Sequence, residues 1–357
     1  MTRKKRLQLW IGAGVLVLAG AVSFAAVRLS TLQGALPAQQ RGKPAPEFIG
    51  ITKWLNSPPL TLKQLHGKVV WIDFWTYSCI NCVRTLPDVR AFYARYHQAG
   101  LEIIGVHSPE FSFEKNISNI TAAIKRYRLP YPIAVDNVMG TWNAYHNDSW
   151  PHVYLIDRNG NVAFNYSGEG GDDALQTQVR ALLKETGARL PPPIDFAASS
   201  FNPHQTPEIY AGYDRGAIEQ TLANTEGYDP GKIVDYRAVS PQTVTDAGPN
   251  GSFFLQGKWF NGGEFVRAAQ DGARVELPFF ARNVFIVAAP AGAEATVSVL
   301  LDGKPVPRQY LGADAPGGII TVNRDDLFQA LHLGGAGVHR LTLTVSKGFE
   351  LYTFTFG

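Results

Sequence analysis

Cysteine is almost absent from the sequence. Only Cys79 and Cys82 occur among 357 residues, and no cysteine follows them. Two cysteines exclude a framework of several structural disulfides. The long segment after Cys82 must therefore be stabilised by packing.

Strong net charge and a second cysteine pair are also lacking. The formal net charge is +3, and the one compact basic run is Met1–Arg6, which argues against a nucleic-acid partner.

A structural zinc site needs four ligands, and one cysteine pair with scattered histidines does not supply them. We therefore expect no bound metal and no cofactor. Copper bound by the two thiolates and a histidine remains an alternative.

The N-terminus carries the only long hydrophobic run. Leu7–Val27 contains 21 uncharged residues after the basic flank, long enough for a helix to cross a bilayer. The basic flank predicts residues 1–28 to be a single-pass anchor in a bacterial inner membrane, with the rest in the periplasm or another extracytoplasmic space. A cleaved signal peptide is the alternative. Residues 29–45 are interpreted as a linker.

The next part of the sequence alternates buried strands with amphipathic helices. Its order, β-α-β-α-β-α-β-β-α, predicts an α/β domain over residues 46–190, with a mixed sheet that is parallel at its centre. The predicted strands are 68–75, 101–107, 131–136 and a hairpin over 152–168.

Proline-rich residues 191–205 are interpreted as a second linker. From Gly251 onward, short alternating runs separated by turn residues predict an all-β sandwich, and we place this domain at residues 206–357. One short helix is expected near Arg324–Leu331. Residues 197–250 give no clear pattern.

The two cysteines lie where the strand that ends at Trp75 passes into a helix. Unpaired N–H groups and the helix dipole stabilise an anion at such a position, and CxxC cysteines there often have lowered pKa values. Cys79 is thus predicted to be a nucleophilic thiolate, and Cys82 to resolve the mixed disulfide. Asp73 interrupts the apolar strand, and burial should raise its pKa and let it relay the proton of Cys82. A buried pair of inert thiols is the alternative.

The sequence resembles the thioredoxin superfamily, and within it most of all the exported TlpA-like and DipZ-like thiol–disulfide proteins. The resemblance is carried by the stretch "VVWIDFWTYSCINC", by Pro87 and by the stretch "WPHVYLID". The resemblance implies that Pro87 kinks the cysteine helix and that Pro151 is a cis-proline that presents substrate. Ser78 and Trp150 depart from the usual pattern, and with Trp75 they are predicted to contact substrate.

The stretches "TPEIYAGYDR", "LDGKPV" and "YTFTFG" resemble the C-terminal domain of DipZ-type proteins, which is similar to carbohydrate-binding-module jelly rolls. A sugar site normally needs exposed aromatic side chains, and Trp259 is the only tryptophan after Trp150.

The resemblance implies a membrane-tethered enzyme that reduces disulfides in exported proteins such as apocytochrome c, as in cytochrome c maturation. A membrane reductase of the DsbD or CcdA type would donate electrons. The alternatives are a binding module for glycan or a protein partner on a thioredoxin-like scaffold, and a copper-handling protein.

Overall fold

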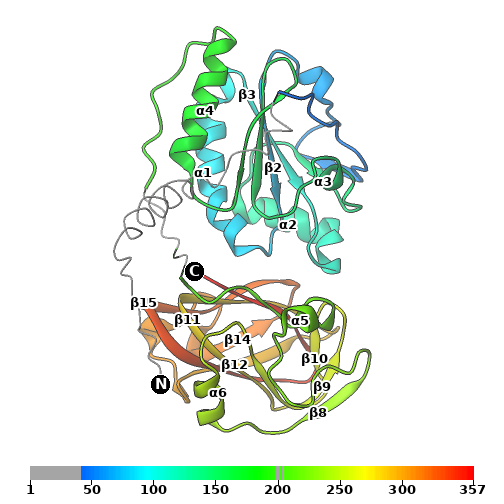
Figure 1. Cartoon of the computed structure of the whole chain (residues 1–357), viewed down its shortest axis with the longest axis vertical. Helices are drawn as coiled ribbons and strands as arrows, with labels where there is room; N and C mark the ends of the chain where they lie inside the picture. Colours follow the sequence, from blue (N-terminus) through cyan, green and yellow to red (C-terminus); the bar gives the residue numbers. More distant parts are fainter. Residues whose placement is uncertain (1–41, 198–201, 203) are drawn as a thin grey trace, which may run out of the picture.

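The computed structural model describes residues 42–197, 202 and 204–357. They form an α/β domain and a β domain that lie one above the other in Figure 1, with the C-terminus between them. The predicted anchor or signal peptide and most of the first linker lie outside these residues. Within the described residues, no helix has the length and apolar character needed to cross a membrane.

The α/β domain contains a six-stranded sheet with the order β1-β4-β3-β2-β5-β6. Strands β2, β3 and β4 are parallel, whereas β1, β5 and β6 pair antiparallel with their neighbours. The strands are β1 Lys53–Leu55, β2 Val69–Trp75, β3 Leu101–His107, β4 Ile133–Val135, β5 His152–Ile156 and β6 Val162–Ser167. The predicted mixed sheet with a parallel centre is confirmed.

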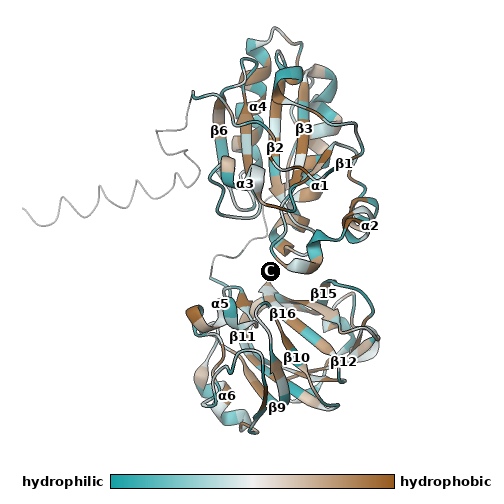
Figure 2. Cartoon of the chain, turned by 90° about the vertical axis from the view of Figure 1, so that its right-hand side faces the viewer, coloured by the Kyte–Doolittle hydropathy of each residue, from teal (hydrophilic) through white to brown (hydrophobic). Residues whose placement is uncertain are grey.

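Strand β2 lies at the centre of this sheet and is buried along its whole length. Val69, Trp71 and Trp75 pack into one hydrophobic cluster, and Val70, Ile72 and Phe74 pack into another on the opposite face. Such two-sided burial explains the nearly continuous apolar run, seen as brown strands inside the upper domain of Figure 2. The helices that flank the sheet are α1 Ile80–Tyr96, α2 Ile117–Tyr127, α3 Gly140–Ala144 and α4 Asp172–Glu185.

The β domain is built on a ten-stranded sheet whose ladders are antiparallel. Its strands are β7 Ile209–Tyr210, β8 Ile233–Tyr236, β9 Phe254–Asn261, β10 Val266–Ala268, β11 Ala273–Pro290, β12 Ala295–Leu301, β13 Lys304–Pro305, β14 Ile319–Val322, β15 Asp326–Val345 and β16 Phe349–Phe356. Two short helices precede most of these strands, α5 Tyr213–Glu219 and α6 Pro241–Ala247. The predicted β-rich character of this half is confirmed.

The helix predicted near Arg324–Leu331 is wrong. Strand β15 begins at Asp326 and pairs with β11, and Phe328 and Ala330 alternate into the core while Leu327 and Gln329 are only partly buried. The segment contains good helix formers, but burial of every second side chain against β11 outweighs that local preference.

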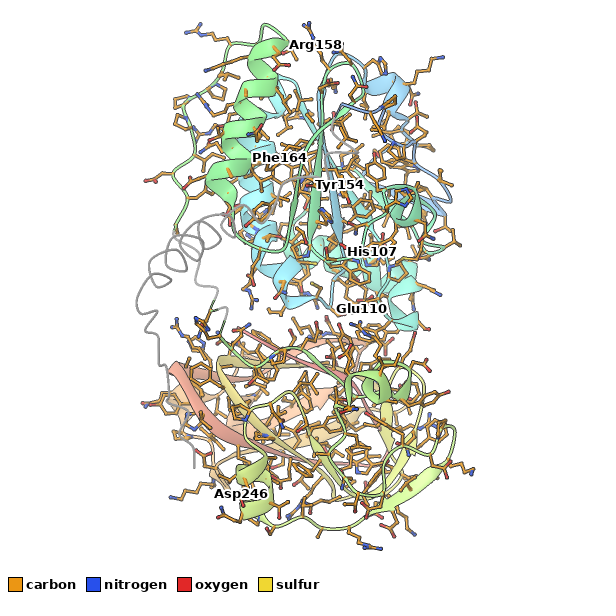
Figure 3. The ribbon with its side chains drawn as sticks, in the orientation of Figure 1. His107, Glu110, Tyr154, Arg158, Phe164 and Asp246 are labelled. Atoms are coloured by element: carbon orange, nitrogen blue, oxygen red, sulfur yellow. The ribbon has the colours of Figure 1, made fainter. Side chains whose placement is uncertain are left out.

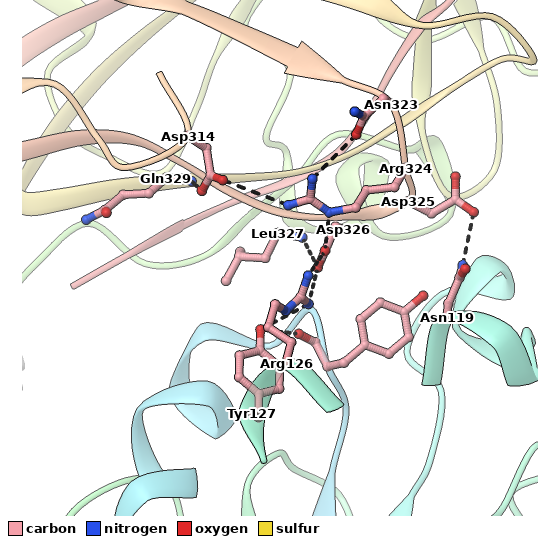
Figure 4. Close-up of polar contacts among 11 residues, drawn as sticks. Asn119, Arg126, Tyr127, Asp314, Asn323, Arg324, Asp325, Asp326, Leu327 and Gln329 are labelled. Carbon is pink, nitrogen blue, oxygen red and sulfur yellow. Dashed lines mark hydrogen bonds and ion pairs between the residues drawn. The ribbon is translucent and has the colours of Figure 1, made fainter. Parts of the chain in front are cut away.

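The two domains contact each other directly. Helix α2 supplies Arg126, which forms an ion pair with Asp326 at the start of β15, and Asn119, whose side-chain amide lies 3.3 Å from Asp325 Oδ2 (Figure 4). Arg324 also pairs with Asp326 at 2.7 Å, so this buried carboxylate lies between two guanidinium groups.

An apolar contact lies beside these polar ones. Phe111 and Phe113 of the α/β domain stack on each other at 5.7 Å, and both lie edge-on to Tyr352 of β16, at 5.2 and 4.8 Å between ring centroids. Tyr210 and Val287 join this cluster from the β domain. The contact holds the β domain against the end of the α/β domain where helix α1 begins.

Candidate active site at the paired cysteines

Cys79 and Cys82 lie at the start of helix α1. Cys79 is the N-cap residue, and its Sγ accepts a hydrogen bond from the Cys82 backbone N–H at 3.2 Å. Both residues are free thiols with their sulfur atoms 2.7 Å apart, and the Cys82 thiol donates to Cys79. Cys82 is fully buried whereas Cys79 is partly exposed. Only the first sulfur is therefore accessible to a substrate.

The expected acidic character of Cys79 is not found. Burial raises the pKa of Cys79 above its usual value, and the charges of Glu110 and Glu208 raise it further, against the lowering effect of the hydrogen bonds with Cys82. Burial also raises the pKa of Cys82, and the Cys79 hydrogen bond and the charge of Asp73 act in the same direction. Two carboxylates near the first cysteine thus oppose the helix dipole.

Asp73 lies in the middle of β2 and is 1% exposed. Neither carboxylate oxygen has a hydrogen-bond partner among the described residues. Burial raises the pKa of Asp73 to about 7, and its charge acts on Cys82. A carboxyl group with this pKa can accept or release a proton at neutral pH, and the relay of the Cys82 proton by Asp73 stays a prediction.

Pro151 and Pro87 occupy the positions that the sequence suggested. The Trp150–Pro151 peptide bond is cis, and Pro87 lies inside helix α1. Trp150 packs on Trp142 at 4.1 Å between ring centroids, and its indole N–H donates to the Ser108 carbonyl at 3.0 Å. One side of Trp150 still faces the space beside Cys79.

Two of the predicted substrate contacts need correction. Trp75 is 0% exposed and packs in the core beside His107, because both faces of β2 are buried. Ser78 is 1% exposed, and its hydroxyl donates to the buried carboxylate of Glu114 at 2.5 Å. Neither side chain is among those that line the space next to Cys79.

Both domains line a pocket of about 190 Å³ that Cys79 faces. The α/β domain contributes Cys79, Ile80, Asn81, Glu110, Asp148, Ser149 and Trp150, and the β domain contributes Glu208, Tyr210, Arg215 and Thr355. Figure 3 shows Glu110 at the lower edge of the α/β domain, facing the β domain.

Glu110 connects the two sides of the pocket. Its Oε1 accepts a hydrogen bond from Tyr210 Oη at 2.7 Å and forms an ion pair with Arg215 at 2.7 Å. The Arg215 guanidinium also lies over the Tyr210 ring, 3.2 Å from its centroid. Burial raises the pKa of Glu208 to about 8, and the charge of Glu110 adds to that shift.

The acidic and β-domain residues of this pocket were not predicted as site residues. The "TPEIYAGYDR" stretch had suggested only a family resemblance, although it contains Glu208, Tyr210 and Arg215. Its alternating polar residues were the available signal, but nothing local in the sequence shows that they face Cys79.

Comparison with known proteins gives matches to both halves of the chain. Residues 41–165 match the AhpC/TSA family, and residues 206–357 match a family described as a thioredoxin-like C-terminal domain. The likeness of this second half to carbohydrate-binding modules is not confirmed by these matches.

Individual relatives extend this result. Protein DipZ of Mycobacterium tuberculosis is 36% identical over 326 residues, which cover 88% of this chain and 43% of DipZ. The chain thus spans less than half the length of that relative. Thiol-disulfide oxidoreductase YkuV of Bacillus subtilis is 31% identical over 145 residues, 40% of this chain and 97% of YkuV. A solved thioredoxin-like protein in the oxidised form is 30% identical, with a TM-score of 0.38, and covers 40% of this chain and 97% of its own.

Proposed function

The chain belongs to the thioredoxin-like thiol–disulfide oxidoreductases, and from that premise we propose that Cys79 and Cys82 form its redox-active dithiol. The observation that carries the proposal is the arrangement of the two sulfur atoms. One faces a pocket, and the other is buried 2.7 Å from it, near an ionisable Asp73. This arrangement suits a nucleophile and a resolving thiol.

The proposed reaction has two exchange steps. Cys79 first loses its thiol proton to solvent. Its thiolate then attacks one sulfur of a substrate disulfide, forms a mixed disulfide and releases the other substrate sulfur as a thiolate. Asp73 accepts the proton of the Cys82 thiol, and the Cys82 thiolate attacks the Cys79 sulfur. This step releases the second substrate thiolate and leaves a Cys79–Cys82 disulfide. Two electrons pass to the substrate, and a proton on Asp73 can be returned when the disulfide is reduced again.

The electrostatics of Cys79 favour the reductant direction. Strongly oxidising CxxC proteins owe their potential to a stabilised reduced form with a very acidic thiol. Here burial and the charges of Glu110 and Glu208 destabilise the thiolate. Such surroundings favour giving electrons to a substrate disulfide over taking them from substrate thiols.

We propose that the enzyme works on exported proteins outside the cytoplasm, held to the membrane by the run Leu7–Val27. Oxidised apocytochrome c is one candidate substrate, and a membrane thiol reductase of the DsbD or CcdA type would return the electrons. Thiol-disulfide oxidoreductase ResA of Bacillus cereus, which is 31% identical over 171 residues, supports a disulfide-handling role.

The two alternatives have less support. Trp259, the one tryptophan offered for a sugar site, is 0% exposed and belongs to the core of the β domain. Among the described residues, no group of three or more histidine, cysteine and acidic side chains could hold a metal ion. A copper role would have to rest on the two thiols alone.

A trapping experiment tests the proposal. In the full chain carrying Cys82→Ser, Cys79 can still attack a substrate disulfide, but no Cys82 thiol is present to resolve the mixed disulfide. Mixed disulfides with cellular proteins should therefore accumulate, and a reducing agent should remove them. Cys79→Ser is the matched control, since its remaining thiol is buried and should trap nothing. Equal trapping by both variants, or none by Cys82→Ser, would refute the proposed roles.

A further inference from the structure

The pocket beside Cys79 limits what can reach the nucleophile. Any sulfur that Cys79 attacks must enter a space of about 190 Å³ bounded on one side by Glu208, Tyr210, Arg215 and Thr355 of the β domain. This volume is below the range of typical small-molecule sites. It suits a cysteine with one neighbouring side chain on an extended segment.

The charges that line this pocket are unequal. Three carboxyl groups face it, those of Glu110, Asp148 and Glu208, against one cation, Arg215. Arg215 is already paired with Glu110 at 2.7 Å and also lies 3.6 Å from Glu219 on its own helix. The positive charge of the pocket is therefore largely neutralised by these two carboxylates.

The other two carboxyl groups are left without a cationic partner in contact. Glu208 accepts a hydrogen bond from the Thr353 hydroxyl at 3.3 Å. The Asp148 side chain is 84% exposed, and the nearest base, His152 at 4.0 Å, stays neutral because burial lowers the pKa of that histidine to about 4. Carboxylates without a cationic partner favour a ligand that brings a positive charge next to them.

We propose that Glu208 and Asp148 select substrate disulfides in which a lysine or arginine lies directly beside the reactive cysteine, on an extended segment that enters between the two domains. The inference rests on the proposed function of the dithiol and adds the substrate class. It also gives the β domain a part in recognition, because Glu208 comes from the segment just before β7.

The test uses the reduced full chain and three peptide homodimers, each linked by one disulfide. The residue after the cysteine is lysine, glutamine or glutamate, and the peptides are otherwise identical. Rapid mixing and acid quench give the second-order rate constant for oxidation of the enzyme. At about pH 9, where a Glu208 carboxyl with a pKa of about 8 is mostly ionised, and at low ionic strength, we expect the lysine peptide to react about ten-fold faster than the glutamate peptide, with the glutamine peptide between them. At about 0.5 M salt the difference should shrink, because screening weakens exposed charge pairs.

Variants then assign the preference to the pocket. Glu208→Gln and Asp148→Asn should each lower the lysine-to-glutamate ratio at least two-fold. The matched control Glu294→Gln removes the same charge from an exposed turn between β11 and β12 and should leave the ratio unchanged. Asp148 is so exposed that its variant keeps the test valid if Glu208→Gln fails to fold.

The possible outcomes are distinct. Equal rate constants for the three peptides overturn the charge preference while leaving the proposed function intact. A preference that persists in both pocket variants, or that is also lost in Glu294→Gln, overturns its assignment to Glu208 and Asp148. Failure of every peptide to oxidise the dithiol counts against the proposed function itself.

Discussion

Replacing Asp73 with asparagine should change how the stability of the α/β domain depends on pH. The wild-type carboxyl is 1% exposed, has no hydrogen-bond partner among the described residues, and has a pKa raised by burial from 3.8 to about 7. The folded state therefore binds this proton more tightly than the unfolded state does. The stability from the protonated form is fully present below pH 4 and is lost as the pH rises through 7.

The size of the effect follows from the pKa difference. A shift of about three units corresponds to ~4 kcal/mol between the two limits, and about 2.5 kcal/mol of it falls between pH 5 and pH 8. Asp73→Asn has no ionisable group at this position. The free energy of unfolding of the variant relative to the wild type should thus rise by about 2.5 kcal/mol over that interval, whatever fixed cost the buried amide adds.

Urea unfolding of the reduced protein at pH 5 and pH 8 measures this difference. Tryptophan fluorescence is a suitable probe, because Trp71 and Trp75 lie on the same strand as Asp73. Other titrating groups cancel when the variant is compared with the wild type at each pH. If the difference in unfolding free energy between variant and wild type is the same at both pH values within about 0.5 kcal/mol, then folding does not raise the pKa of Asp73. That result would refute the role of Asp73 as proton acceptor for Cys82.

Two further predictions concern the nucleophile and the domain contact. Burial and the charges of Glu110 and Glu208 raise the pKa of Cys79. In the Cys82→Ser variant, the rate at which iodoacetamide alkylates Cys79 should therefore still be rising with pH at about pH 9. A rate that reaches a plateau below about pH 8 would contradict the raised pKa. Arg126→Ala leaves the buried carboxylate of Asp326 with one cation instead of two and should weaken domain docking by about 1–3 kcal/mol. Small-angle scattering would then detect a larger radius of gyration, whereas Lys125→Ala, an exposed position on the same helix, should leave it unchanged.

The residues of the proposed redox site could be picked out from the sequence because their signals are local. Asp73 is the one charged residue in an otherwise apolar buried strand, and the two cysteines of the chain lie at the start of the helix that follows it. Trp75 and Ser78 were misread because nearness in sequence was taken for nearness to substrate. Trp75 lies inside because both faces of β2 are buried, and the hydrogen bond to Glu114 keeps Ser78 inside.

The β-domain side of the pocket could not be predicted in the same way. Glu208 and Arg215 reach Cys79 only because two separately folded domains dock, through contacts such as Glu110 with Arg215 that span 105 positions of sequence. Periodicity specifies the face that an element buries within its own domain. It carries no information about which surfaces of two domains meet.

The stacked pair Phe111 and Phe113 also bears on solubility. In the intact chain these rings are covered by Tyr352 and its neighbours in the β domain. Cutting the chain between the domains would uncover a contiguous aromatic patch on each half, and such patches promote self-association. An α/β half expressed alone should therefore carry polar replacements at Phe111 and Phe113 before its aggregation behaviour or its turnover is compared with that of the whole protein.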